Sequence, residues 1–373
     1  MPTYRRHLQR PAESFTDYRA RRLERLTATV LRRRIIYLDV NYWIDLLAAD
    51  AGQPRGPEHA ELLELLRKGV GSGQLVCPVS MTTALEVDRQ RDQSSRKATC
   101  KLIDELSLGI ALISFDEIIS SEVAHFFLSA LVPDGLRPNR ENVWTRTGIM
   151  LVSDPPPPPF ALTPRQERAL QKTLFDSLWK LSLEEGLSQG AASEPAPFYL
   201  LARQLTEGSR AHADEVRTFD DAYRSELKGL VEGSEPMIRE AVDCLRDLLG
   251  GPPTAGSLNP GWTILLLNAL AQSSAARKAL PTLHILASLH ALVRWNRTQT
   301  FKANDFPDFH HAASALAYCD LFLTERGLVS MLSRGPSKLI ESSNCEAAWA
   351  PSEALSKVRN LLAGVRAGSQ RRV

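Results

Sequence analysis

The sequence predicts an α/β protein in which a central parallel sheet is interrupted by a large all-helical insertion. Three observations lead to this fold class. Short apolar runs alternate with helix-forming stretches between residues 34 and 118, and the same alternation resumes between 278 and 350. Residues 119–277 carry helical patterns and linkers but no strand signal. Alternating buried strands and helices are typical of a parallel sheet covered by helices.

The N-terminal third of the chain supplies three of the expected strands. Phe15–Leu31 predicts a basic helix with Thr16 as its cap. The run Ile35–Val40 has no polar alternation, which favours a strand buried on both faces. Leu75–Val79 and Ala111–Phe115 are the next two candidate strands, and a proline weakens the first of these. Helices are expected at 42–47 and 59–68, and a single long helix is expected at 80–106.

The remaining elements are predicted from prolines, glycines and helical spacing. Five consecutive prolines at 155–159 predict a rigid extended connector. Thr163-Pro164 predicts the start of a helix that continues to about residue 185, because proline is favoured in the first helical turn. Residues 187–197 and 250–261 have linker composition. Further helices are expected at 118–131, 215–249 (with a break at 233–236), 281–295, 308–319, 327–333 and 351–362, and strands at 320–324 and 338–340.

The chain of 373 residues has room for one large or two modest domains. The expected parts are a basic N-terminal helical arm at 1–33, a discontinuous α/β domain at 34–118 and 278–350, the helical insertion at 119–277, and a C-terminal helix with a basic tail at 351–373. Apolar residues make up 43% and charged residues 24%, as in ordinary globular proteins.

The two ends of the chain are basic although the net charge is only +2. Residues 1–34 contain ten arginines and three acids, a formal charge of +7, and residues 357–373 contain basic clusters without an acid. This distribution suggests a polyanionic partner. The alternative is a solvated tail without a binding role.

Cysteine usage and the N-terminus indicate a cytoplasmic protein. The five cysteines are scattered and form no Cys-x-x-Cys pair, which argues against a disulfide framework or a zinc ribbon. The N-terminal charges are not followed by the apolar stretch of a secretory signal. No apolar run approaches the roughly 18 residues of a membrane span, so no membrane partner is expected.

Acidic residues from distant segments are expected to meet at one edge of the sheet. Asp39 ends the first strand, Glu86 lies on the helix after the second, Asp308 begins a helix, and Asp320 and Glu325 bracket a later strand. Ligands of open parallel sheets bind at the carboxyl ends of the strands. Carboxylates that repel one another need a cation between them, and oxygen ligands favour Mg²⁺ or Mn²⁺. Such a site suits phosphodiester hydrolysis.

Each acid also has a purely structural interpretation. Asp39 could cap the following helix, and Thr83-Ala84-Leu85-Glu86 fits a capping box. Asp308 could be the N-cap behind Pro307, and Thr324 could cap the helix that begins near residue 327.

This pattern resembles the PIN domain, a family of metal-dependent ribonucleases. The family motifs are an Asp that ends a buried strand, a strand followed by Ser or Thr and a helix with Glu, an Asp four residues before an alanine-rich helix, and a strand that ends in Thr and an acid. The corresponding segments, in family order, are Asp39-Val40-Asn41, Ser80 to Glu86, Asp308 to Ala315, and Leu323-Thr324-Glu325. The resemblance covers about 34–118 and 280–345.

The resemblance implies a three-layer α/β/α domain that cleaves RNA. It also implies that the acids named above are the metal ligands. Asn41, Thr324, His311 and Arg89 are the residues expected to meet the substrate, and Arg91, Arg96 and Lys97 are expected on the same helix as Arg89. Two features depart from the family. The last acid is Glu325 rather than Asp, so that Asp320 is an alternative, and the helical insertion is longer than usual.

Two other families that use an Asp at the end of a strand fit this sequence less well. A haloacid-dehalogenase phosphatase needs Asp-x-Asp, but Asn41 stands two residues after Asp39, and the strand-end Lys of a receiver domain has no counterpart. An inactive PIN-like scaffold that binds RNA or protein through the insertion is the main alternative. The family also includes ribonuclease toxins, which implies a bound antitoxin as a protein partner. Contact of the basic helix with a membrane surface is disfavoured because the helix lacks a broad apolar face.

Overall fold

The computed structural model describes residues 2–10, 12–132, 136–152, 161–189, 198–248, 250, 260–296 and 298–370. The chain divides into two compact units. Unit 1 consists of Met1–Ile113, Trp144–Ser193 and Ala350–Val373, and unit 2 of Ser114–Val143 and Glu194–Trp349. The predicted insertion at 119–277 is therefore divided between the two units. The proline run at 155–159 and most of both predicted linkers lie outside the described residues.

Unit 1 contains a parallel strand pair and a separate antiparallel pair. Strand β1 (Arg34–Leu38) lies parallel to β2 (Leu75–Val76), with Arg34 opposite Leu75. Strand β3 (Ile110–Leu112) lies antiparallel to β4 (Trp144–Arg146). Beyond β2, an isolated parallel bridge joins Val79 to Ala111. After β2 the backbone N–H groups of Cys77 and Val79 donate to Leu106 O and Ile110 O, and Pro78 between them has no N–H to donate. Strand β4 was not predicted.

The helices of unit 1 confirm most of the predicted pattern. They are α1 (Pro2–Leu8), α2 (Phe15–Val30), α3 (Val40–Asp50), α4 (Pro57–Gly71), α5 (Met81–Asp88), α6 (Gln93–Ser107), α8 (Thr147–Leu151), α9 (Pro164–Leu178), α10 (Leu183–Gln189) and α20 (Pro351–Gln370). The single long helix predicted at 80–106 is wrong. Asp92 ends the run by accepting the backbone N–H of Ser95 at 2.7 Å and so starts α6 as a new helix.

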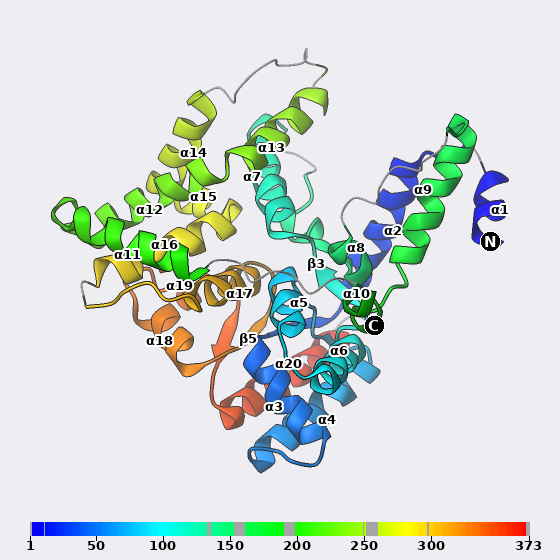
Figure 1. The fold of residues 1–373 in the computed structure, drawn as a ribbon, viewed down its shortest axis with the longest axis horizontal. Coiled ribbons are helices and arrows are strands. Elements are labelled where there is room, and N and C mark those ends of the chain that lie inside the picture. The colour runs from blue at the N-terminus through cyan, green and yellow to red at the C-terminus, as the bar shows by residue number, and fades with distance from the viewer. Residues whose placement is uncertain are drawn as a thin grey trace. The chain divides into compact units, whose positions relative to one another are not determined.

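The N-terminal arm packs on a helix from the middle of the chain. Helices α1 and α2 both contact α9, beside which Figure 1 draws them. The cap of α2 is Ser14, whose hydroxyl accepts the N–H of Asp17, and the prediction of Thr16 is wrong. Thr163 and Pro164 start α9 as predicted, with a capping box that includes Gln166. The predicted continuation to about residue 185 is wrong, because α9 ends at Leu178 and α10 begins separately at Leu183.

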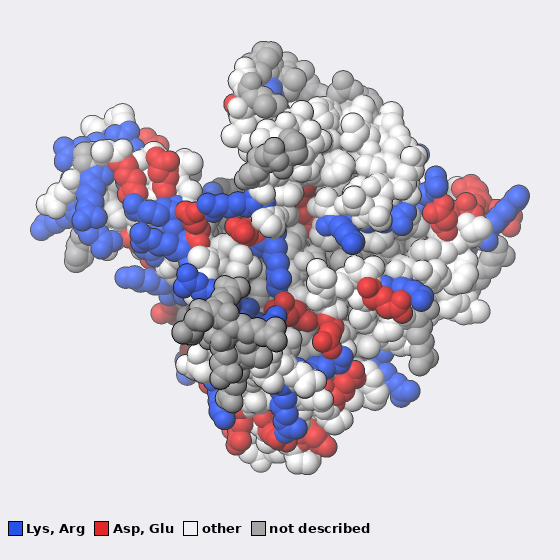
Figure 2. All heavy atoms as spheres, turned by 180° about the vertical axis from the view of Figure 1, so that it is seen from behind, with Lys and Arg blue, Asp and Glu red and all other residues white. Residues whose placement is uncertain are grey.

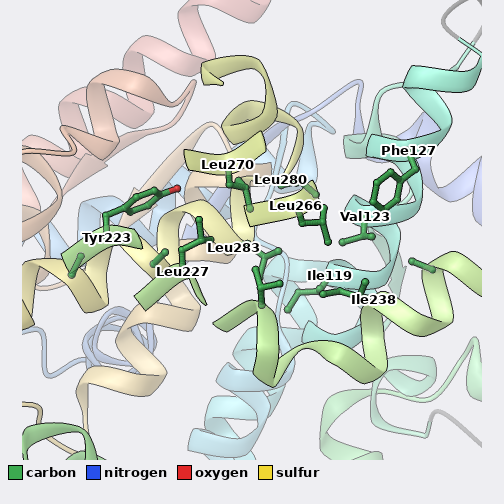
Figure 3. Packing of buried hydrophobic residues seen from close by; sticks show 14 of the residues in the cluster. Ile119, Val123, Phe127, Tyr223, Leu227, Ile238, Leu266, Leu270, Leu280 and Leu283 are labelled. Carbon is green, nitrogen blue, oxygen red and sulfur yellow. The ribbon is translucent and has the colours of Figure 1, made fainter. Parts of the chain in front are cut away.

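Unit 2 is mostly helical and has its own apolar core. Its helices are α7 (Phe115–Leu131), η1 (Asn139–Glu141), α11 (Phe198–Ala211), η2 (Ala213–Glu215), α12 (Phe219–Gly233), α13 (Glu235–Leu248), α14 (Pro260–Gln272), α15 (Ser274–Ala279), α16 (Pro281–Trp295), α17 (Asp305–Tyr318), α18 (Arg326–Arg334) and α19 (Leu339–Ser342). Figure 3 shows side chains of α7, α12, α13, α14 and α16 packed together. Each fully buried leucine or isoleucine there contributes about 2 kcal/mol to folding.

A second parallel pair lies in unit 2. Strand β5 (Leu321–Leu323) pairs with β6 (Glu346–Ala348), with Leu321 opposite Glu346. The last strand was predicted at 338–340, but those residues begin α19, and the strand comes a few residues later. Both units thus contain a parallel pair among many helices, so the protein is broadly α/β and mostly helical.

Candidate functional site

Asp39 follows the last residue of β1 and is the N-cap of α3. Its carboxylate Oδ1 accepts the backbone N–H of Tyr42 at 3.2 Å, and only 3% of the residue is exposed. Burial raises the pKa of the Tyr42 phenol, and the nearby negative charges of Asp39 and Asp45 raise it further. The capping interpretation of Asp39 is confirmed, and the cap also fixes the carboxylate at the carboxyl end of the strand.

The second motif is tied to the first through a buried hydroxyl pair. Tyr37 Oη of β1 lies 2.6 Å from Ser80 Oγ, and Ser80 is the N-cap of α5 through the N–H of Thr83. Glu86 therefore lies beyond the first turn of α5, and the capping-box interpretation for it is wrong. Since Asp39 and Ser80 both follow strands of a parallel pair, they lie at the same end of that pair.

The predicted phosphate-binding residues of unit 1 are spread over three helices. Asn41 is exposed in the first turn of α3, and Arg89 is exposed at the C-cap of α5. Arg96 and Lys97 belong to α6 and not to the helix that carries Glu86, because the long helix is divided at Asp92. They form ion pairs with Asp88 (3.2 Å) and Glu184 (3.2 Å) respectively.

In unit 2, Asp308 lies in the first turn of α17. The helix begins at Asp305 after the N-cap residue Asn304, so the prediction that Asp308 is the N-cap is wrong. Helix α17 contacts β5, which follows it after two residues. Asp308 is about ten residues, or roughly 15 Å, from the C-terminal end of α17. His311, one turn further on, is 2% exposed.

The two candidates for the last acid lie at opposite ends of β5. Asp320 precedes the strand and Glu325 follows it, a separation of roughly 16 Å along extended chain. Glu325 is exposed, and it occupies the N-cap position of α18 without a side-chain cap hydrogen bond. The prediction that Thr324 caps α18 is therefore wrong. Thr324 is 1% exposed, and its N–H donates to Ala348 O at 3.1 Å.

Asp320 is part of an ion pair that the sequence did not reveal. Arg140 of η1 donates from Nη2 to Asp320 Oδ1 at 3.0 Å and from Nε to Tyr318 O at 3.1 Å. This pairing fastens η1 to the turn between α17 and β5 and gives Asp320 a structural role. No sequence spacing relates Arg140 to Asp320, because they are 180 residues apart.

The five acids are divided between the units, with Asp39 and Glu86 in unit 1 and the other three in unit 2. In the described part of the chain, no three His, Cys, Asp or Glu side chains form a group that could hold a metal ion. The donor types themselves fit a hard divalent cation, since every one is a carboxylate.

Unit 2 also contains a fully buried carboxylate that is not among the predicted site residues. Glu122 of α7 is 0% exposed and accepts hydrogen bonds from the N–H and hydroxyl of Thr282 and from the hydroxyl of Tyr318. Burial raises the pKa of Glu122 to about 7, although these hydrogen bonds lower it. The signal was present in the sequence, because Glu122 stands between Ile118-Ile119 and Val123 on the apolar face of a predicted helix.

The basic arm presents arginines to solvent. At the left of Figure 2, Lys and Arg side chains gather over α1, α2 and α9, mixed with some acids. Arg19, Arg25 and Arg32 are exposed there. In the described part of the chain these three have no ion-pair partner, whereas Arg21 pairs with Glu13 at 2.7 Å.

None of the helices in the described ranges combines the length and apolarity that a membrane span requires. Comparison of the chain with protein-family models, curated proteins and solved structures gave no match.

Proposed function

We propose that this protein is a divalent-metal-dependent ribonuclease of the PIN type, which hydrolyses phosphodiester bonds inside RNA chains. The proposal joins the four-motif resemblance of the sequence to the positions of the acids. It assigns the metal to Asp39, Glu86, Asp308 and Glu325, with Mg²⁺ or Mn²⁺ as the cofactor.

One observation carries the proposal. In each unit one acid follows the carboxyl end of a parallel strand, Asp39 after β1 and Glu325 after β5, which is where open parallel sheets bind ligands. Neither Glu86 nor Asp308 is a helix cap, so the helix-cap interpretation no longer competes with a metal-binding role for these two residues. Glu325 is assigned in preference to Asp320, since Asp320 lies at the other end of β5 and pairs with Arg140.

The metal ion and the residues around it would have separate roles in RNA cleavage. Bound Mg²⁺ or Mn²⁺ would supply positive charge that acidifies water and stabilises the attacking and leaving oxygens. The N–H of Tyr42 holds the Asp39 carboxylate in one orientation, so that little ordering is needed when the cation binds. Arg89 and Asn41 are exposed at the ends of α5 and α3 and would hold the RNA backbone.

A cleavage assay tests the proposal. The purified chain is expected to cut single-stranded RNA with Mn²⁺ or Mg²⁺, and EDTA is expected to stop the reaction. Asp39→Asn and Asp308→Asn should each lower the rate by about 100-fold or more, because loss of a ligand costs at least as much as loss of a residue that supports one. Circular dichroism would establish that each variant is folded.

Asp320→Asn is the matched control for Glu325→Gln, because Asp320 precedes β5 whereas Glu325 follows it. It should retain most of the activity, whereas Glu325→Gln should lose it. Cleavage by both Asp39→Asn and Asp308→Asn at the normal rate would contradict the assignment.

A scaffold that binds RNA without cutting it is the second candidate. The exposed arginines of α2 favour RNA binding whether or not the acids hold a metal. This candidate predicts salt-sensitive RNA binding with no cleavage at any metal concentration.

A further inference from the structure

Unit 2 contains a cavity of about 510 Å³ that none of the proposed metal ligands lines. Its walls come from α12, α15, α16, the end of α17 and the segment from 336 to 344. This volume lies within the range of pockets that hold small organic ligands. The cavity belongs to the helical part of the chain, for which the ribonuclease proposal gives no role.

One face of α16 forms a wall of the cavity. Pro281, His284, Ile285 and Ser288 line it at helical spacing. Ser288 is 0% exposed, and its Oγ has no hydrogen-bond partner. A buried hydroxyl without a partner is unfavourable, so a partner supplied by a ligand would be a specific gain in binding free energy. A second buried hydroxyl without a partner, Ser337 Oγ, belongs to the segment 336–344 that also lines the cavity.

The charges at the cavity favour an anion. Arg277 and Lys278 of α15 line it, and in the described part of the chain neither has an acidic partner. Arg277 is fixed in place by donating to Leu270 O at 2.8 Å and Ala271 O at 2.7 Å. The acid that lines the cavity, Asp220, pairs with Arg224 at 2.7 Å, and its charge is offset by that pair. Two cations of unit 2 thus remain available to a phosphate.

Aromatic rings complete the lining. Tyr223 and Phe219 of α12 and His284 of α16 all face the cavity. Figure 3 shows Tyr223 at one end of the row of core side chains. Its hydroxyl lies 2.9 Å from His284 Nδ1. Burial lowers the pKa of His284 to about 4, and the charge of Arg277 lowers it further, so the ring is neutral at pH 7 and offers no third cation.

We propose that this cavity binds a nucleoside monophosphate. Since the guanidinium of Arg277 already lies over the ring of Tyr223, 5.4 Å from its centroid, the phosphate would lie at Arg277 and Lys278 and the planar base against the ring of Phe219. The hydroxyl of Ser288 would bond a polar atom of the nucleoside. Phosphate, planar ring and polar edge are the three features that cations, aromatic faces and a buried hydroxyl recognise together.

Calorimetry on the full-length protein tests this site, with AMP, GMP, CMP and UMP as probes. At least one nucleotide should bind with a micromolar dissociation constant and raise the melting temperature. Adenosine and inorganic phosphate serve as the two halves of the ligand, and each should bind at least tenfold more weakly. Equal binding of inorganic phosphate alone would contradict the nucleotide assignment, and so would the failure of all four nucleotides to bind.

Variants connect the binding to this cavity. Lys278→Gln and Ser288→Ala should each weaken binding about tenfold. Because Ser288→Ala removes a buried hydroxyl without a partner, the free protein should keep its melting temperature, so that weaker binding would not reflect unfolding. Lys228→Gln, an exposed lysine of α12 outside the cavity, is the control and should bind normally. Unchanged affinity in both cavity variants would overturn the proposal. The cavity contains no proposed metal ligand, so this test and the RNA cleavage assay can fail independently.

Discussion

Glu122 shows how a single buried group connects sequence, packing and pH dependence. It is enclosed on α7 and bonded to Thr282 and Tyr318, and burial raises its pKa to about 7 from the ordinary value of 4.5. Between these two pH values the folded protein holds a proton that the unfolded chain has lost. Stability therefore falls as pH rises through this window, by about 3 kcal/mol once pH exceeds 7.

Glu122→Gln should remove this part of the pH dependence, because the amide keeps the shape and does not ionise. Urea midpoints measured between pH 4.5 and pH 8 should fall for the natural protein and change less for the variant. Glu232→Gln, an exposed residue of α12, is the control and should follow the natural protein. If the urea midpoints of Glu122→Gln and the natural protein changed equally with pH, Glu122 would not be the source of this pH dependence.

For single residues, the sequence was enough to identify the candidate acids, but it did not always predict which groups they contact. The cap made by Asp39 follows from a local pattern, so the sequence alone predicted it correctly. The partner of Asp320 is 180 residues away, and local spacing carries no information about such a pair. Glu325 and Asp320 were equivalent in the sequence, and only the direction of β5 separates them.

At the scale of elements, the N-terminal arm is held by a buried polar network. Asp176 of α9 accepts hydrogen bonds from His7 Nε2 at 2.9 Å and from Tyr18 Oη at 2.5 Å. Burial alone would raise the pKa of Asp176, but the bonds from Tyr18 and His7 outweigh it and the pKa is lowered. The charged form of Asp176 therefore stabilises the packing of the arm at pH values above the ordinary pKa of Asp. This stabilisation is lost as the pH falls.

The exposed face of α2 should bind RNA through charge. Arg19→Gln together with Arg25→Gln should weaken binding of single-stranded RNA, since two phosphate contacts are lost. The slope of the logarithm of the affinity against the logarithm of salt concentration should become shallower by about 1.4. Arg203→Gln, an exposed arginine of α11 that pairs with Glu207, is the control. An unchanged slope in the double variant would remove α2 from the RNA-binding surface.

The helices and strands that follow from a local pattern of apolar residues were predicted best. Strands β1 and β5 are buried apolar runs, and α16 and α17 have clear helical spacing, so all four were expected near their observed positions. The error at 80–106 arose because Asp92 acts as a cap within an otherwise helical stretch. Strand β4 has three residues and forms only through its antiparallel partner β3, which a local pattern cannot reveal.

For the whole molecule, the predicted α/β class is confirmed in its coarse form, but its organisation differs from the simple insertion that was expected. The segment 144–193 groups with the N-terminal unit, because α9 supports the arm and α8 and β4 pack on β3. The contacts of α9 with the arm join residues as far apart as Tyr18 and Asp176, which are separated by 158 positions, and composition or periodicity cannot specify them. The ribonuclease proposal depends on Asp39, Glu86, Asp308 and Glu325 acting as ligands of a divalent cation.

The most direct test of that claim is anomalous diffraction from crystals soaked in Mn²⁺. The account predicts a manganese peak with oxygens of Asp39 and Asp308 about 2 Å away, and its loss in Asp308→Asn crystals. Ordered Asp39 and Asp308 side chains that face separate regions, with no manganese at either, would contradict it.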